Sequence, residues 1–303
     1  DYTDSSCPAL LLEPQRTNVL EYSEYFDSSY YIKAGGTSLD FGYLAPDGTN
    51  SAYKLSGNTA SIYAPSVIDS SYSRSIWART TSGTGTAQLL TYFGNTNNIF
   101  NITEEWQRFE VSSLTVSTGD LNFYAADLRG VSTLDEIIIW GAQAENASYP
   151  TSYIPTYGTS VTRAGEVFGG AGDSSTFNDS EGVLYAEIEA FANDGTNRVI
   201  TISDGTTSNR VQIYFNYSNG ITGGVAGQAV ISFSGDFTQN TKLAFKYKVN
   251  DFALWVNGIE VGTDIVGSAP TGLNVINFDN GASGSNFYGN TKQLIYFPTA
   301  LSD

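Results

Sequence analysis

The aromatic side chains are the groups in this sequence that are best suited to binding a ligand. The 303 residues include 20 Tyr, 17 Phe and 4 Trp, and no His. Rigid aromatic rings bind the apolar C–H faces of sugars, while neighbouring polar groups fix the orientation of the ligand. Without His there is no imidazole base, no Ser-His or Cys-His nucleophile pair and little zinc chemistry. Any catalysis would therefore need carboxylates, Tyr, Lys or a metal.

Trp77 is the strongest candidate for an exposed ring in the first half of the chain. In SRSIWARTT, alternation along a strand places Trp77 with Arg79 and opposite the apolar residues on either side of it. We predict that Trp77 and Arg79 bind a ligand, with packing in a core as the alternative. Trp140 ends the apolar run IIIW, so we expect it to lie in the core.

A second tryptophan candidate lies in the strand-turn-strand sequence DFALWVNGIEV. Leu254 and Val256 point one way along this strand, while Trp255 and Asn257 point the other. If the first face is the core, Trp255 lies on the outer surface of its sheet. We therefore predict Trp255 and Asn257 as ligand-binding residues, with Tyr214 in QIYFN as a weaker companion. A buried ring with a satisfied polar tip is the alternative for each aromatic candidate.

The charge of the chain argues against two classes of partner. There are 31 acidic and 14 basic residues, which gives a net charge of −17 at pH 7. Such a surface repels phosphate backbones and anionic lipids, so we expect no nucleic-acid partner and no membrane insertion. No apolar run approaches the roughly 20 residues of a membrane span, and no signal peptide is visible. Neutral glycans and divalent cations remain compatible with this charge.

Two single-residue features bear on the context of the chain. Cys7 is the one cysteine, so no disulfide can form within the chain. The sequence contains no Met, not even at its start. We therefore expect Asp1 to be an internal or processed position of a longer protein.

Short alternating segments fill both halves of the chain. Examples are SAYKLSG and QRFEVSSLTV in the first half, and NRVITISD and KLAFKYKV in the second. Turns rich in Gly, Asn and Asp separate them, and no window of about 11 residues sustains an apolar face with helical period. The pattern predicts an all-β fold with two consecutive antiparallel β-sandwich domains. The segment from Gly141 to Glu166 has neither period and marks the boundary between them.

The segments that flank this boundary also resemble known families. LLLEPQRTN with EYSEYF, ITEEWQRFEVS and IWGAQAENASYPTSYIPT together resemble a jelly-roll carbohydrate-binding module of bacteriophage tail and other virion adhesion proteins. GVLYAEIEAF, KLAFKYKVNDFALWVNGIEV and KQLIYFPTALSD resemble a concanavalin A-like lectin/glucanase domain of the laminin-G kind. The resemblances imply jelly-roll domains over residues 1–160 and 167–303, with a joint between Tyr157 and Gly172.

Both resemblances imply a structural calcium ion, held by oxygen ligands between loops. In the first domain they point to Glu24, Asp135 and Glu136 as metal ligands. In the second domain the Asp-rich turns at Asp204 and Asp279 are the options. Because none of these segments has the regular DxDxDG spacing of a dedicated calcium loop, solvated turn acids are the alternative.

The resemblance to glucanases does not extend to a catalytic pair. Glu187 and Glu189 in AEIEAF share one face of a strand, but the family pattern has an Asp between two Glu that are four or more residues apart. We therefore predict no enzymatic activity and take this pair as a solvent-facing part of a strand. Trp106 matches a tryptophan that follows a turn in the first family, where its role is structural.

These expectations combine into one leading functional hypothesis. The chain is expected to be a non-enzymatic glycan-binding region, involved in host-surface recognition, of a larger phage fibre, spike or virion structural protein. It would then lie on the virion surface or outside the cell, as a homo-oligomer or with other virion proteins. The alternatives are an assembly module of a virion or extracellular filament, and a binding module of a polysaccharide-degrading enzyme.

Overall fold

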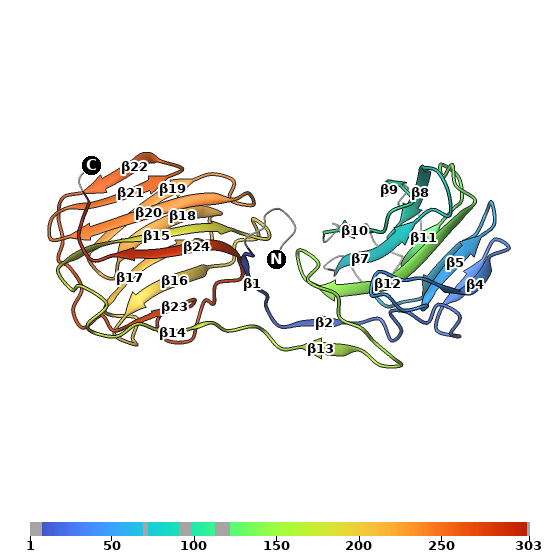
Figure 1. Cartoon of the computed structure of the whole chain (residues 1–303), viewed down its shortest axis with the longest axis horizontal. Coiled ribbons are helices and arrows are strands. Elements are labelled where there is room, and N and C mark those ends of the chain that lie inside the picture. The colour runs from blue at the N-terminus through green and yellow to red at the C-terminus, as the bar shows by residue number, and fades with distance from the viewer. Residues whose placement is uncertain (1–7, 69–71, 91–97, 113–121, 302–303) are drawn as a thin grey trace. The chain divides into compact units, whose positions relative to one another are not determined.

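The computed structural model describes residues 8–68, 72–90, 98–112 and 122–301 of the chain (Figure 1). These residues form 24 strands and no helix, so they offer no helical membrane span. Every strand ladder among them is antiparallel. The expected all-β fold with antiparallel sandwiches is confirmed. The chain folds into two compact units, described here one at a time.

The unit Gln15–Ala164 contains two five-stranded sheets and a two-stranded ribbon. The first sheet has the order β10 (Gln107–Val111), β7 (Tyr72–Arg79), β12 (Glu136–Asn146), β5 (Ala52–Ser56) and β4 (Ser38–Tyr43). The second has the order β3 (Ile32–Ala34), β6 (Ser61–Ala64), β11 (Phe123–Asp127), β8 (Gly85–Leu89) and β9 (Ile99–Ile102). The ribbon pairs β13 (Val161–Arg163) with β2 (Arg16–Asn18).

The core of this unit lies between its two five-stranded sheets. Alternate residues of each strand enter it, such as Ile76 of β7, Ile139 of β12 and Ile62 of β6, and all three are fully buried. The intervening residues must face outward because side chains of a strand alternate between the two faces. The core therefore determines which aromatic side chains reach the outer surface.

The other unit contains two six-stranded sheets. One has the order β1 (Leu10–Leu12), β24 (Gly289–Phe297), β15 (Glu181–Glu189), β20 (Thr241–Lys248), β21 (Phe252–Val256) and β22 (Ile259–Asp264). The second has the order β14 (Gly169–Ala171), β23 (Val275–Asn277), β16 (Arg198–Ser203), β17 (Arg210–Phe215), β18 (Gly220–Val225) and β19 (Ala229–Ser234).

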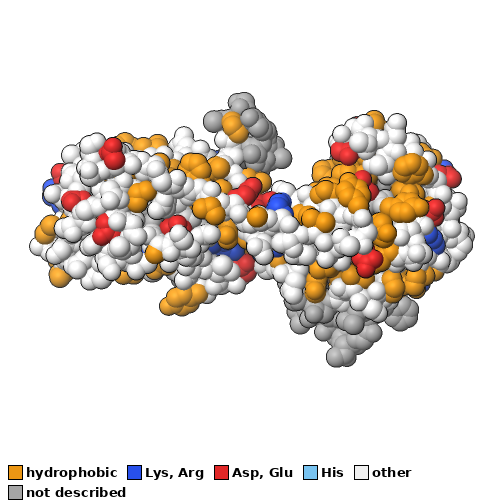
Figure 2. All heavy atoms as spheres, turned by 90° about the horizontal axis from the view of Figure 1, so that it is seen from below, with side chains coloured by type: hydrophobic (Ala, Val, Ile, Leu, Met, Phe, Trp, Pro, Cys, Tyr) orange, Lys and Arg blue, Asp and Glu red, His pale blue; other side chains and the backbone are white. Residues whose placement is uncertain are grey.

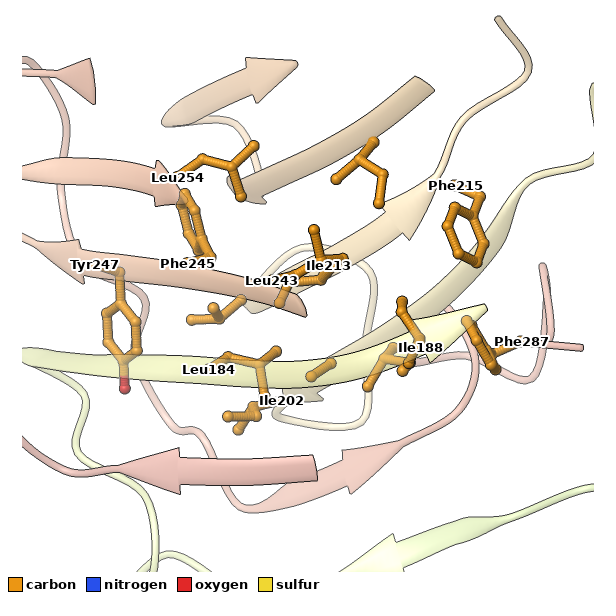
Figure 3. Close-up of a cluster of buried hydrophobic side chains, with 14 of the residues drawn as sticks. Leu184, Ile188, Ile202, Ile213, Phe215, Leu243, Phe245, Tyr247, Leu254 and Phe287 are labelled. Atoms are coloured by element: carbon orange, nitrogen blue, oxygen red, sulfur yellow. The ribbon is translucent and has the colours of Figure 1, made fainter. Parts of the chain in front are cut away.

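Aliphatic and aromatic side chains from both six-stranded sheets fill the space between them. Figure 3 shows Leu184 of β15 and Phe245 of β20 in this cluster together with Ile213 of β17. Gly223 of β18 permits the close packing, because a Cβ atom there would lie 2.5 Å from the Phe245 ring. Leu254 of β21 is also fully buried, so its neighbours along the strand, including Trp255, face outward.

The structure divides the chain differently from the expected domains 1–160 and 167–303. Leu10–Leu12, expected to lead into the first domain, pairs with β24 of the second unit, and Leu12 enters the core of that unit. Val161–Arg163, expected within the joint, pairs with β2 and extends the first unit. The physical reason is the same in both cases, since each short strand gains backbone hydrogen bonds at a sheet or ribbon edge.

Candidate functional site

A cluster of aromatic side chains lies on the outward face of the sheet β10-β7-β12-β5-β4. We call it the tryptophan face, and it consists of Tyr43, Trp77, Trp106, Trp140 and Tyr153. Hydrophobic side chains also gather visibly on the unit Gln15–Ala164 in Figure 2. The strand register places Trp77 directly between Trp140 of β12 and Arg108 of β10. Trp77 therefore lies outside the main core of this unit but packs, partly buried, against a smaller buried cluster that includes Ile138 and Trp140, at a central position on this face.

Hydrogen bonds hold two of the three tryptophans of this face. The Trp106 indole Nε1 donates to the Leu44 carbonyl at 3.1 Å, and Trp140 Nε1 donates to Ser51 Oγ at 2.9 Å. Trp77 Nε1 has no protein partner among the described residues, so a satisfied polar tip does not explain its position. Trp140 is buried as expected, at 4% exposure, but it belongs to this outward cluster and not to the main core.

Tyr153 completes the face from the segment that follows β12. Its ring lies 4.7 Å from the Trp140 ring, centroid to centroid. Its hydroxyl lies 2.8 Å from Ser23 Oγ and donates to Glu24 Oε1 at 2.9 Å. Burial is the main reason why the pKa of Tyr153 lies well above its usual range. Tyr153 is therefore a neutral hydrogen-bond donor with a fixed orientation.

The buried carboxylate of Glu145 anchors the segment that carries Tyr153. The Glu145 side chain is fully buried, accepts hydrogen bonds from Thr151 N at 3.0 Å and Thr151 Oγ1 at 2.8 Å, and also binds Gln143 Nε2. Arg16 Nε lies 3.9 Å from the same carboxylate. Burial raises the pKa of Glu145, although the bonds from Thr151 and the nearby arginines oppose this.

Cationic side chains lie beside the aromatic rings of the tryptophan face. The guanidinium carbon of Arg79 lies 5.3 Å from the centroid of the Trp106 ring, a cation–π distance. Lys54 Nζ lies 5.9 Å from the Tyr43 ring and 3.4 Å from Asp40 Oδ2. The predicted pair of Trp77 and Arg79 is thus found on one face, with polar groups at its edge.

The three predicted metal ligands of the first domain do not form a common site. Glu24 accepts hydrogen bonds from Tyr153 and Tyr157, whereas Glu136 binds Thr81 and lies 3.7 Å from Lys54 Nζ. Within the described parts of the chain, no group of three or more His, Cys, Asp or Glu could hold a metal ion. The residues as placed therefore do not fit a carboxylate-rich calcium site.

The two acidic turns of the second unit are stabilised locally. Asp204 accepts hydrogen bonds from Thr206 N and Oγ1 and from Asn209, and these bonds lower its pKa. Asp279 accepts a hydrogen bond from the backbone of Gly281. Both carboxylates thus act as turn caps in this structure.

The two glutamates of β15 share one side of the strand, and one of them is hydrogen-bonded to a neighbouring side chain. Glu187 and Glu189 are both partly exposed on the outward side of the strand, as predicted. Glu187 Oε1 accepts a hydrogen bond from Asn240 at 2.6 Å.

The predicted site residues of the second unit lie on two opposite surfaces. Trp255 is half-buried on the outward face of β21, beside a hollow of about 160 Å³, with Lys246 Nζ 5.6 Å from its ring. Tyr214 belongs to β17 and faces outward from the other sheet of the sandwich. Tyr214 is therefore not a companion of Trp255, because the core separates the two sheets.

Asn257, which we predicted to bind ligand together with Trp255, has a clear role in a turn. Its backbone is left-handed, with φ of 52°, and its Oδ1 atom accepts a hydrogen bond from Lys242 N at 2.9 Å. The side chain thereby connects the turn to β20.

We expect Asn257→Ala to lower the free energy of unfolding by about 1–2 kcal/mol, because it removes this hydrogen bond and strains a left-handed position. Asn257→Gly, which keeps the backbone conformation, should lose less. Urea unfolding of both variants checks the order. A ligand role would instead require both substitutions to weaken glycan binding without a change in stability.

An aromatic pair that was not predicted from the sequence lies on the other sheet of the first unit. The rings of Tyr63 in β6 and Tyr124 in β11 stack with centroids 4.6 Å apart. The guanidinium carbon of Arg129 lies 5.7 Å from the Tyr124 ring, and its Nη2 atom binds Asp127 at 2.7 Å. Alternation in SIYA places Tyr63 outward, and that signal could have identified it.

Comparisons with known proteins give distant structural similarities. No protein-family model and no curated protein sequence matches the chain significantly. The CBM40 domain of the Ruminococcus gnavus IT-sialidase, bound to alpha2,3 sialyllactose, is 13% identical with a TM-score of 0.36, over 46% of this chain and 92% of that one. Domains LG4-5 of the mouse laminin alpha1 chain are 12% identical with a TM-score of 0.32, over 89% and 93%.

A third solved structure covers nearly the whole chain. The tandem CBM22-1 and CBM22-2 domain from a Paenibacillus barcinonensis protein is 10% identical with a TM-score of 0.31, over 99% of this chain and 100% of that one. None of these three TM-scores reaches 0.5. The function proposed below therefore rests on this chain's own residues.

Proposed function

We propose that the chain binds carbohydrate and that the tryptophan face of the unit Gln15–Ala164 is its binding surface. The observation that supports this is the gathering of the partly exposed rings of Tyr43, Trp77, Trp106 and Tyr153 over the buried Trp140 on one outward sheet face. Such rings offer rigid platforms to the C–H faces of sugars, and they lose little conformational entropy on binding. Arg79, beside Trp106, supplies donors for sugar hydroxyls at the edge of the platform.

The test is a printed glycan array probed with the intact chain, followed by isothermal titration calorimetry with the strongest array glycan. We expect a dissociation constant below roughly 1 mM, since weaker binding would not support recognition by a single site. Absence of any array signal, with and without added calcium, would contradict the proposal. The glycan itself is identified by this experiment.

The finer form of the proposal concerns the biological setting. We propose host-surface recognition by a larger phage fibre, spike or virion structural protein, oligomeric and located on the virion surface or outside the cell. This form is supported by the phrases around LLLEPQRTN and SYPTSYIPT. Virion assembly genes beside the coding sequence would support it. A polysaccharide-degrading catalytic domain in the same reading frame would instead support the enzyme-appended alternative.

A calcium ion remains a prediction that is independent of sugar binding. Because Glu24, Asp135 and Glu136 do not come together in this structure, the prediction concerns calcium binding by the chain and not this ligand set. Bound calcium should raise the melting temperature of the chain, because a ligand stabilises the state that binds it. Thermal unfolding in calcium chloride and in EGTA measures this. Equal melting temperatures would contradict the prediction.

A further inference from the structure

The outward face of the sheet β14-β23-β16-β17-β18-β19 contains a hollow that the tryptophan face does not explain. Its volume is about 280 Å³, near the lower end of ordinary small-molecule pockets. The strand register places Tyr214, Thr222 and Ser232 in one row across three strands, and all three line the hollow. We call it the tyrosine hollow.

Hydrogen bonds fix the polar groups of the tyrosine hollow. Asn216 Nδ2 donates to Thr222 Oγ1 at 3.0 Å, and Thr222 Oγ1 lies 2.9 Å from Ser232 Oγ. Asn216 Oδ1 accepts hydrogen bonds from Ser218 N and Gly220 N. The amide of Asn216 therefore has a fixed orientation, and one of its two N–H groups remains for a ligand.

Aromatic rings also line the tyrosine hollow, beside these polar groups. Tyr217, in the turn between β17 and β18, is 75% exposed, and Phe233 of β19 is 39% exposed. Both line the hollow together with the half-buried Tyr214. A site that combines aromatic walls with an oriented amide and hydroxyl groups matches a ligand with apolar faces and hydroxyl edges.

The lining of the hollow is uncharged, in contrast to the chain as a whole. The described residues that line it include no Lys, Arg, Asp or Glu, although the chain has a net charge of −17 at pH 7. Anionic ligands usually need charged hydrogen-bond donors. We infer that the tyrosine hollow is a second ligand site and that it takes an uncharged saccharide ring. This site and the tryptophan face share no residues, since they belong to different units.

Saturation-transfer difference NMR on the intact chain tests the inference, with maltotriose, cellotriose and mannotriose as probes at up to about 10 mM. The substitution Trp77→Ala is introduced first, so that the tryptophan face contributes as little as possible to the trisaccharide binding that is measured. Tyr217→Ala and Tyr214→Ala are then added to this background in separate chains. Tyr185→Ala is the matched control, because Tyr185 faces outward from the opposite sheet of the same sandwich.

We expect the Trp77→Ala chain to retain binding of at least one trisaccharide. Tyr217→Ala or Tyr214→Ala should weaken that binding about tenfold or more, while Tyr185→Ala leaves it unchanged. Because Tyr217 is largely exposed, Tyr217→Ala should have the same melting temperature as the parent chain. If Tyr214→Ala does not fold, the near-isosteric substitution Thr222→Val takes its place.

Two results would overturn the second site. One is a Trp77→Ala chain that binds none of the three trisaccharides. The other is a trisaccharide affinity that stays unchanged in Tyr214→Ala, Tyr217→Ala and Thr222→Val. Failure of the proposed function at the tryptophan face can be distinguished from these two results. In that case the Trp77→Ala chain would bind the array glycans as strongly as the parent chain does.

Discussion

Replacing Trp77 by alanine is expected to weaken binding of the strongest array glycan about 30-fold or more, which corresponds to about 2 kcal/mol. Trp77 lies between Trp140 and Arg108 in the register of the sheet. Removal of its ring would leave a gap at the centre of the platform, while Trp106 and Trp140 keep their own hydrogen bonds. Isothermal titration calorimetry gives the change in dissociation constant directly.

Two variants separate lost contact from lost structure in this experiment. Trp77→Phe retains an aromatic ring and should keep most of the affinity. Trp255→Ala removes a half-buried tryptophan from the other unit and should leave binding by the tryptophan face unchanged. An unchanged affinity in Trp77→Ala, or an equal loss in Trp255→Ala, would show that the tryptophan face is not the site.

The outward position of Trp77 could be predicted because its neighbours along β7, Ile76 and Ala78, are apolar and enter the core, although Arg74 interrupts the apolar series on that face. The same reasoning succeeded for Trp255, whose neighbours Leu254 and Val256 enter the core. It was less informative for Trp140, because Ile138 and Trp140 are covered on the outward side by Tyr153 and neighbouring side chains. Both faces of that strand are apolar, and alternation then carries no information.

The assembly of the tryptophan face could not be predicted from local pattern. Trp106 meets Arg79 only because β10 and β7 are neighbours, and strand order is not encoded in the period of either strand. The same limit explains why Tyr214 was wrongly paired with Trp255. Each faces outward, but their strands belong to different sheets.

The placement of Leu10–Leu12 shows a related limit. Three consecutive leucines indicate a buried or half-buried segment, and Leu12 is indeed buried. A strand of three residues has no period with which to specify its partner, and its neighbour in the structure, β24, lies near the other end of the sequence. The domain boundaries predicted from the sequence therefore placed Leu10–Leu12 with the first domain, whereas the strand pairs with β24.

Glu145→Ala is expected to lower the free energy of unfolding of the unit Gln15–Ala164 by about 3 kcal/mol, since removal of one buried charged partner leaves the others uncompensated. The groups left behind are Thr151 N, Thr151 Oγ1 and the Gln143 amide, with Arg16 nearby. Urea unfolding can be followed by fluorescence in a Trp255→Phe background, where the three remaining tryptophans all lie in this unit.

The loss should also reach the tryptophan face. Thr151 lies two residues before Tyr153, so release of this segment would move one ring of the platform. Glycan affinity should therefore fall together with stability in Glu145→Ala. A variant that unfolds within about 0.5 kcal/mol of the parent would show that the carboxylate does not anchor this segment.

The pH dependence of stability separates the charge of Glu145 from its shape. Burial raises the pKa of Glu145 above its ordinary value of 4.5, so the folded state binds this proton more tightly than the unfolded state. The cost of the ionised form is fully present near pH 7 and is lost as the pH falls through the raised pKa towards about 4.5.

Glu145→Gln, which has no such proton, lacks this contribution. The free energy of unfolding of the parent minus that of Glu145→Gln should therefore rise as the pH is lowered over this range. A difference that stays flat or falls would mean that hydrogen bonds from Thr151 and the nearby arginines outweigh the cost of burial.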